Sequence, residues 1–258
     1  LAPGPALAIT SLVLIVYVVM GGAHADILTD GVQGFIMVAV GLLVTGLFLT
    51  GYGVEGGFTG MIDSLRAQDE NLVGWLNKTD VLYHSWWSVL AIFMAHVPLG
   101  LLPHIGNKLW ALKEPSQRMS FLRLAFAFGL VLWMLGLGGL MARVILGEGI
   151  GSNQALVLLF IELFPSWFAA LLGVGILAAV MSTADGLVVS SSQIVANDLY
   201  RLTFVPRFRK NLDEDEIERR VLNVSRISTV IIMLLCTLLA WQMLDMNVTI
   251  IVWIGTGC

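Results

Sequence analysis

The stretch AAVMSTADGL, residues 178–187, places two hydroxyl groups and a carboxylate inside a long apolar segment. These groups belong to Ser182, Thr183 and Asp185. Ionisable side chains are costly within a membrane, and where they occur they often mark an ion or substrate path. The apolar sequence around this cluster decides the fold class, and the cluster itself is the first candidate for a functional site.

The composition indicates an integral membrane protein. Of the 258 residues, 57% are hydrophobic and only 12% are charged, whereas a soluble domain carries about a quarter charged residues. Helices satisfy their own backbone hydrogen bonds in lipid, so we expect an all-α membrane protein with a single transmembrane domain over residues 1–258. Because the chain starts at Leu1 and ends inside an apolar stretch, we expect an internal fragment of a longer protein.

Apolar segments predict six transmembrane helices plus the start of a seventh near Val248. Each of the six is long enough to cross about 30 Å of hydrocarbon. They cover residues 6–22, 31–52, 84–104, 118–146, 166–200 and 222–244.

The charge of the connecting loops predicts the orientation of these spans. Basic residues gather in loops 105–123 and 201–226, whereas loops 53–83 and 147–165 are acidic. Basic loops prefer the cytoplasm, so the first pair is expected inside and the second outside. The short turn at 23–30 is then also inside, and the expected location is the cytoplasmic membrane.

The hydroxyls of Ser182 and Thr183 have two interpretations. Sodium is a hard cation that takes oxygen ligands, as calcium and magnesium do, and the carbonyl of Ala179 one turn earlier can complete the set. Alternatively, serine and threonine in membrane helices bond back to the carbonyl four residues earlier. Spacing alone favours the second interpretation.

Two carboxylates also leave alternatives open. Asp185 follows Ser182 by three residues and shares its helix face, so it belongs either to a cation path or to a structural pair within the bundle. Asp30 opens the second span in the stretch TDGVQ, residues 29–33. It is either an N-cap that forms a capping box with Gln33 or a carboxylate that faces the ion path.

The third span ends in HVPLGLLPH, residues 96–104, where prolines and a glycine interrupt helical hydrogen bonding. In transporters, broken spans expose backbone groups that bind substrate near the midplane. A kinked packing helix with a packing histidine is the alternative. The candidate substrate-binding residues are His96, Pro98, Leu99 and Pro103.

Several classes of function are disfavoured. No nucleophile–base pair, metal-ligand spacing or nucleotide motif is visible, so we expect no enzyme and no organic cofactor. The glycines Gly136, Gly138 and Gly139 follow no strand, and they predict close helix packing instead of a phosphate loop. The basic loops lack the aromatic interleaving of a nucleic-acid surface. The expected partners are the lipid bilayer and a small-molecule substrate.

Three stretches together resemble the sodium:solute symporter family. Residues 17–33 are similar to its Tyr…Gly-Gly…Thr-Asp…Gln stretch, and residues 102–113 to its Gln-Pro-His-Ile stretch before a basic loop. Residues 178–201 resemble its Ala-Ala-x-Met-Ser-Ser/Thr stretch that ends in Asp-Leu-Tyr-Lys/Arg. Each stretch alone is a weak signal, but their order and spacing over nearly the whole chain are specific.

The resemblance implies the inverted-repeat fold of two five-helix halves, of which this chain would hold core helices four to nine and the start of ten. It implies a sodium site at the Ala179 carbonyl and the Ser182 and Thr183 hydroxyls, completed by core helix one, which the chain lacks. It also implies a second cation site at Asp30, Ser182 and Asp185. No metal other than sodium is implied.

Two departures from the family pattern refine the expected function. The carboxylate of Asp185 stands where several members have serine or alanine, which would strengthen sodium binding or admit a proton. Leu99, Leu101 and Leu102 replace aromatic and glutamine residues, which favours an organic acid or amino acid over a sugar. We therefore expect sodium-coupled symport of a small organic solute. A transporter-like sensor domain fused to a signalling module is the alternative.

Overall fold

The computed structural model describes residues 3–80, 82–96, 103–110, 112–208, 213–244 and 246. Every regular element in this part of the chain is a helix, which confirms the all-α prediction for the described residues. The chain packs as two compact units. The first unit is drawn from Leu1–Val32, Leu102–Ala111 and Val180–Gly255, and the second from Gln33–Leu101, Leu112–Ala179 and Thr256–Cys258.

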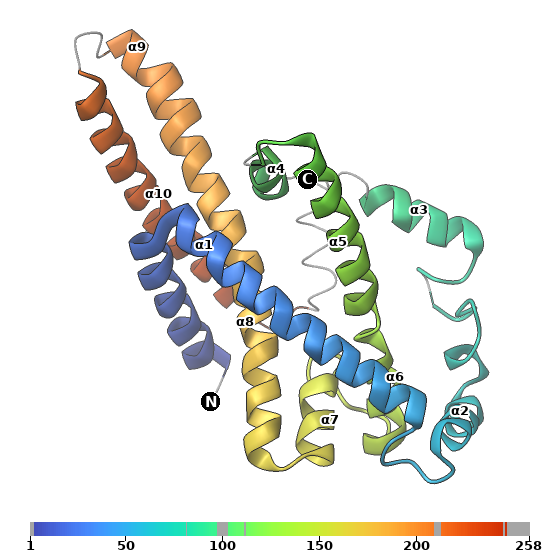
Figure 1. The fold of residues 1–258 in the computed structure, drawn as a ribbon. Coiled ribbons are helices and arrows are strands. Elements are labelled where there is room, and N and C mark those ends of the chain that lie inside the picture. The colour runs from blue at the N-terminus through green and yellow to red at the C-terminus, as the bar shows by residue number, and fades with distance from the viewer. Residues whose placement is uncertain are drawn as a thin grey trace. The chain divides into compact units, whose positions relative to one another are not determined.

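Helix α1 (Pro3–Thr50) corrects the prediction of a turn at residues 23–30, because helical hydrogen bonding continues through this segment. The segment contains no proline, the residue that most strongly interrupts a helix. Two separate stretches of α1, Gly4–Gly21 and Ile27–Thr50, are each long and apolar enough to span a membrane. Figure 1 shows a sharp bend in the ribbon between them, next to the pair Gly21-Gly22, and glycine is a frequent cause of helix kinks.

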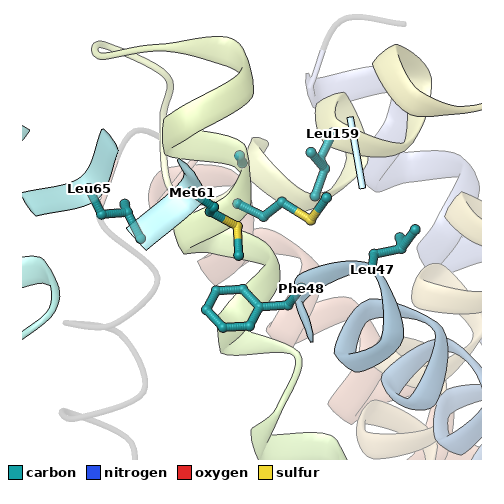
Figure 2. Close-up of a cluster of buried hydrophobic side chains, with 7 residues drawn as sticks. Leu47, Phe48, Met61, Leu65 and Leu159 are labelled. Carbon is teal, nitrogen blue, oxygen red and sulfur yellow. The ribbon is translucent and has the colours of Figure 1, made fainter. Parts of the chain in front are cut away.

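The second unit contains short helices around the end of α1, and its core is apolar. The buried cluster of Figure 2 joins Leu47 and Phe48 of α1 to side chains of three other helices, Met61, Leu65 and Leu159 among them. The rings of Phe48 and Phe58 meet edge to face at 5.8 Å. Besides the end of α1, the helices of the second unit are α2 (Gly57–Gln68), η1 (Glu70–Leu72), α3 (Trp86–His96), α5 (Pro115–Trp133), α6 (Gly136–Leu146), α7 (Ala155–Leu163) and the first part of α8 (Ser166–Gln193).

One of three glycines predicted to pack closely does so. A Cβ atom at Gly138 would lie 2.5 Å from the side chain of Leu156 and 3.2 Å from that of Val44, so neighbouring side chains pack closely against this glycine. The same atom at Gly136 or Gly139 would meet nothing within 4 Å. The fourth predicted span, 118–146, is divided between α5 and α6.

The first unit contains the end of α8 and the helices that follow it. A π-helical segment, η3 (Ile194–Phe204), continues α8 and leads into α9 (Val205–Phe208), and α10 (Glu214–Gln242) runs back beside η3 (Figure 1). Helix α4 (Pro103–Trp110) also belongs here. Leu14, Val188 and Met233 form its apolar cluster. Its buried polar residues are Ser11, Asp185, Ser190, Ser192, Ser228 and Thr229.

Five helical stretches within the described residues can span a membrane by length and composition, so the predicted number of spans is not reproduced there. In place of the third span, 84–104, the structure has α3 and α4. The start of the seventh, near Val248, lies outside the described residues. Helix α10 begins eight residues before the predicted 222, because acidic residues of its first turn favour the positive end of the helix dipole.

Candidate functional site

Three segments of the first unit meet at the carboxylate of Asp30. The hydroxyl of Ser182 on α8 donates a hydrogen bond to Oδ1 of Asp30, although the two residues are 152 positions apart. The ammonium group of Lys108 on α4 donates to Oδ2 of the same carboxylate and forms an ion pair with it. The side chain of Asp30 is 18% exposed and that of Lys108 is 30% exposed, so the group is shielded from solvent on most sides.

The position of Asp30 within α1 excludes one of the two alternatives left by the sequence. Because the helix runs from Pro3 to Thr50, Asp30 is an interior residue and not an N-cap, and the capping-box interpretation is wrong. The Oε1 atom of Gln33 is buried and accepts no hydrogen bond within the described residues. The carboxylate of Asp30 is therefore committed to partners on other helices.

Asp185 is fully buried one turn beyond Ser182 on α8. Its Oδ1 atom accepts a hydrogen bond from the backbone N–H of Gly186 at 2.8 Å. Its Oδ2 atom has no hydrogen-bond partner within the part of the chain that the structure describes, and the same holds for the buried hydroxyl of Tyr17. Contacts within the described residues thus join Asp30 to Ser182 but do not join Asp185 to either of them.

The buried state of Asp185 has an energetic consequence. Neighbouring positions on its helix, Met181, Ala184 and Val188, belong to the apolar cluster around Leu14. A buried polar atom that lacks a partner costs about 1–3 kcal/mol relative to a bonded one. Such a carboxylate oxygen is therefore available to a ligand, whether a cation, a proton or water.

The other residues predicted to bind sodium, Ala179 and Thr183, lie on α8 within one turn of Ser182. Helix α8 is regular from Ser166 to Gln193, so Ala179 lies one turn before Thr183. Thr183 is exposed, and Ala179 and Ser182 are half-buried.

The predicted substrate residues cannot be compared with the structure. Pro98 and Leu99 lie outside the described residues, as do the side chains of His96 and Pro103. On either side of this stretch, α3 ends at His96 and α4 begins at Pro103. Proline is favoured at the first position of a helix, where its missing N–H has no intrahelical acceptor.

A cavity of about 140 Å³, lined by polar and apolar residues, lies two turns beyond Asp185, between α1, α8 and α10 of the first unit. Ser192 of α8 and Ser225 of α10 both line it, with their hydroxyl oxygens 3.4 Å apart. Thr229 also lines it and donates to the carbonyl of Ser225 at 3.0 Å. The cavity accounts for part of the polar stretch that ends α8 and can hold water, because it offers several hydrogen-bonding groups.

Sequence reasoning missed two parts of this region. It treated Lys108 only as a charge of a basic loop, because no local pattern reveals a partner 78 positions away. It also passed over Ser225 and Thr229, which look like ordinary small residues of a packed helix. Their spacing of four residues was the available signal, since it places both hydroxyls on one helix face.

Comparison with known proteins gives a family match and several related transporters. The model of the sodium:solute symporter family matches residues 4–257. The chain is 29% identical over 254 residues to the sodium/pantothenate symporter of Haemophilus influenzae, which covers 97% of this chain and 49% of that protein. It is 28% identical over 262 residues to the osmoregulated proline transporter of Bacillus subtilis, with 96% and 49% covered.

A third relative is the monocarboxylic acid transporter of Corynebacterium glutamicum, which is 26% identical over 266 residues, with 95% of this chain and 46% of that protein covered. The chain thus spans about half the length of the curated relatives it matches. No solved structure matches it. Several helices of the described chain are able to span a membrane, as a multi-pass membrane protein requires. Because the family model matches nearly all of its residues, the chain belongs to the sodium:solute symporter family.

Proposed function

We propose that the whole protein is a sodium-coupled symporter that carries a small organic solute across the cytoplasmic membrane. The observation that carries the proposal is the hydrogen bond between Ser182 and Asp30. It joins two of the three stretches that resemble the family, and it does so through the oxygen-bearing groups that a hard cation prefers. Family membership supports the same function.

Sodium is proposed to bind at two places on α8. The first is formed by the carbonyl of Ala179 and the hydroxyls of Ser182 and Thr183, with further ligands from core helix one. The second is formed by Asp30, Ser182 and Asp185. The buried Oδ2 atom of Asp185, which has no hydrogen-bond partner within the described residues, supports a role in holding a cation or a proton, because a bound ion would satisfy it.

The proposed solute is an organic acid or an amino acid rather than a sugar. The relatives described above are named for pantothenate, monocarboxylic acids and proline, and the leucines before Pro103 make that stretch of sequence apolar. The solute is proposed to bind near His96, Pro98, Leu99 and Pro103, with no organic cofactor.

Residues 1–258 are proposed to form a single transporter domain in which the chain supplies core helices four to nine and the start of ten. Loops 105–123 and 201–226 then face the cytoplasm. Joint binding of sodium and solute would shift the balance between outward-open and inward-open states. Sodium can shift that balance only by the difference between its affinities for the two states.

Uptake by the full-length protein in proteoliposomes tests the proposal. Labelled pantothenate, lactate, proline and glucose are offered with an inward gradient of sodium chloride, and choline chloride replaces it in the control. We expect accumulation of at least one acid or amino acid with sodium and little with choline. Accumulation that is equal in the two salts would refute sodium coupling, and accumulation of glucose alone would refute the proposed solute class.

A further inference from the structure

The carboxylate of Asp30 is occupied on both of its oxygens. Oδ1 accepts from the hydroxyl of Ser182, and Oδ2 accepts from the ammonium of Lys108. Of these two partners only Lys108 carries a charge, and its charge is that of a sodium ion. The ammonium group therefore already neutralises the carboxylate where a second cation would bind.

A sodium ion and this ammonium cannot both be held closely by Asp30. Two like charges a few ångströms apart repel strongly where solvent is largely excluded, and here the side chain of Asp30 is only 18% exposed. Asp30 alone neutralises one of them, and within the described residues no hydrogen bond brings the other carboxylate of the proposed site, that of Asp185, to the ammonium. Binding of sodium at Asp30 would thus require that the ammonium of Lys108 withdraw.

The two partners differ in how easily they can leave. Ser182 is held in α8, a helix of 28 residues, on a side chain with a single rotatable bond before its oxygen. Lys108 stands in α4, a helix of eight residues, at the end of a flexible four-carbon stem. Its ammonium can move away without any change in the backbone, so Lys108 is the partner that can be displaced.

We propose that Lys108 is a built-in competitor for sodium at Asp30: its ammonium holds the carboxylate when sodium is absent and is displaced when sodium binds. The inference rests on the proposed sodium site and adds a means of regulating it. The ammonium keeps the sodium-free site neutral, which lowers the cost of burying Asp30 while the empty carrier returns. It also weakens sodium binding and so favours release.

Equilibrium binding of radioactive sodium to the purified full-length protein tests the proposal without a known solute. At a sodium concentration well below saturation, Lys108→Gln is expected to bind about tenfold more sodium than the parent, which equals about 1.4 kcal/mol. Lys108→Arg keeps the positive charge and is expected to bind as weakly as the parent. In an Asp30→Asn background, Lys108→Gln should add nothing, because the contested carboxylate is gone.

Lys113→Gln is the matched control, since it removes an equal charge from an exposed lysine five residues away. Equal or lower sodium binding by Lys108→Gln, with a thermal midpoint like that of the parent, would overturn the competition. If Lys108→Gln does not fold, Lys108→Met serves as a second neutral variant. If neither neutral variant folds while Lys108→Arg is stable, the ion pair with Asp30 is purely structural. That result would also overturn the proposed competition with sodium.

The proposed function fails separately from this inference. A parent protein that binds no sodium even at saturating concentration would refute the sodium sites themselves. A parent that binds sodium, with Lys108→Gln unchanged, would refute only the competition by Lys108.

Discussion

The two units of the molecule bury different chemistry. In the second unit, the described residues that are buried in its clusters are all apolar, as around Met61 and Leu159 in Figure 2. Among the described residues of the first unit, six buried ones are polar, and one of these is Asp185 with its carboxylate. Apolar burial stabilises a fold, whereas polar burial does so only when every group finds a partner.

The difference separates residues that hold the structure from residues that can bind. Asp30, Lys108 and Ser182 all belong to the first unit, and so do most of the three stretches that resemble the family. Substitutions in the buried apolar clusters of the second unit should therefore change stability and leave sodium binding alone, and substitutions of Ser182, Thr183 and Asp185 in the first unit should do the reverse. Four predictions test this separation, each on the full-length protein.

The largest effect is expected in the apolar core of the second unit. Leu159→Ala removes a fully buried side chain and should lower the free energy of unfolding by about 2–5 kcal/mol through lost burial and a new cavity. Thermal unfolding in detergent measures it. Ile161→Ala on the same helix is the control, because Ile161 is 59% exposed. A change in sodium half-saturation with Leu159→Ala would break the separation.

A smaller loss of stability is expected where Gly138 of α6 packs against Leu156 of α7. Gly138→Ala places a Cβ atom 2.5 Å from the side chain of Leu156 and should cost about 1–3 kcal/mol of stability by overpacking. Gly139→Ala meets nothing and should stabilise by about 0.5–1 kcal/mol, because alanine favours the helix. The same thermal assay reads both, and equal shifts for the two variants would contradict the packing.

The sodium site is tested by Ser182→Ala combined with Thr183→Ala. Loss of two oxygen ligands should raise the sodium half-saturation of uptake about tenfold, which equals about 1.4 kcal/mol, with little change in stability. Ser191→Ala on the same helix is the control, since this exposed hydroxyl only bonds back to the carbonyl of Leu187 at 2.8 Å. Unchanged sodium dependence of the double variant would refute the proposed sodium site at these hydroxyls.

The smallest effect is expected for Asp185→Asn. Sodium should raise the thermal midpoint of the parent, because a ligand that binds only the folded state stabilises it, and the variant should lose about 1 kcal/mol of that sodium-linked gain. Its uptake should also respond differently to pH, since a titratable group is removed. Asp198→Asn, at an exposed site, is the control. Sodium and pH responses identical to the parent would count against a cation or proton role.

Much of the fold could be read from the sequence because apolar length and helix-breaking residues are local properties. The existence of long apolar helices followed from such signals, and the family followed from the three stretches that resemble it. The turn at 23–30 was wrong, because polar residues and glycines without proline do not stop helical hydrogen bonding. The early start of α10 was missed because hydropathy detects only the apolar part of a helix.

Part of the candidate site could also be predicted from the sequence. The family resemblance placed Asp30 and Ser182 in one proposed site, and the structure puts their side chains in contact. Their role in binding a cation stays a prediction. Lys108 could not have been found, because its contact with Asp30 depends on how α4 packs and not on any nearby pattern.

The pair of Asp30 and Lys108 also bears on how the protein responds to voltage. A membrane potential acts on net charge, at about 2.3 kcal/mol per elementary charge for each 100 mV. A carboxylate and an ammonium in contact sum to zero, so the electric field exerts almost no net force on them together. While Lys108 is paired with Asp30, the membrane voltage would exert almost no net force on these two groups. It would act on the sodium ion that enters the site.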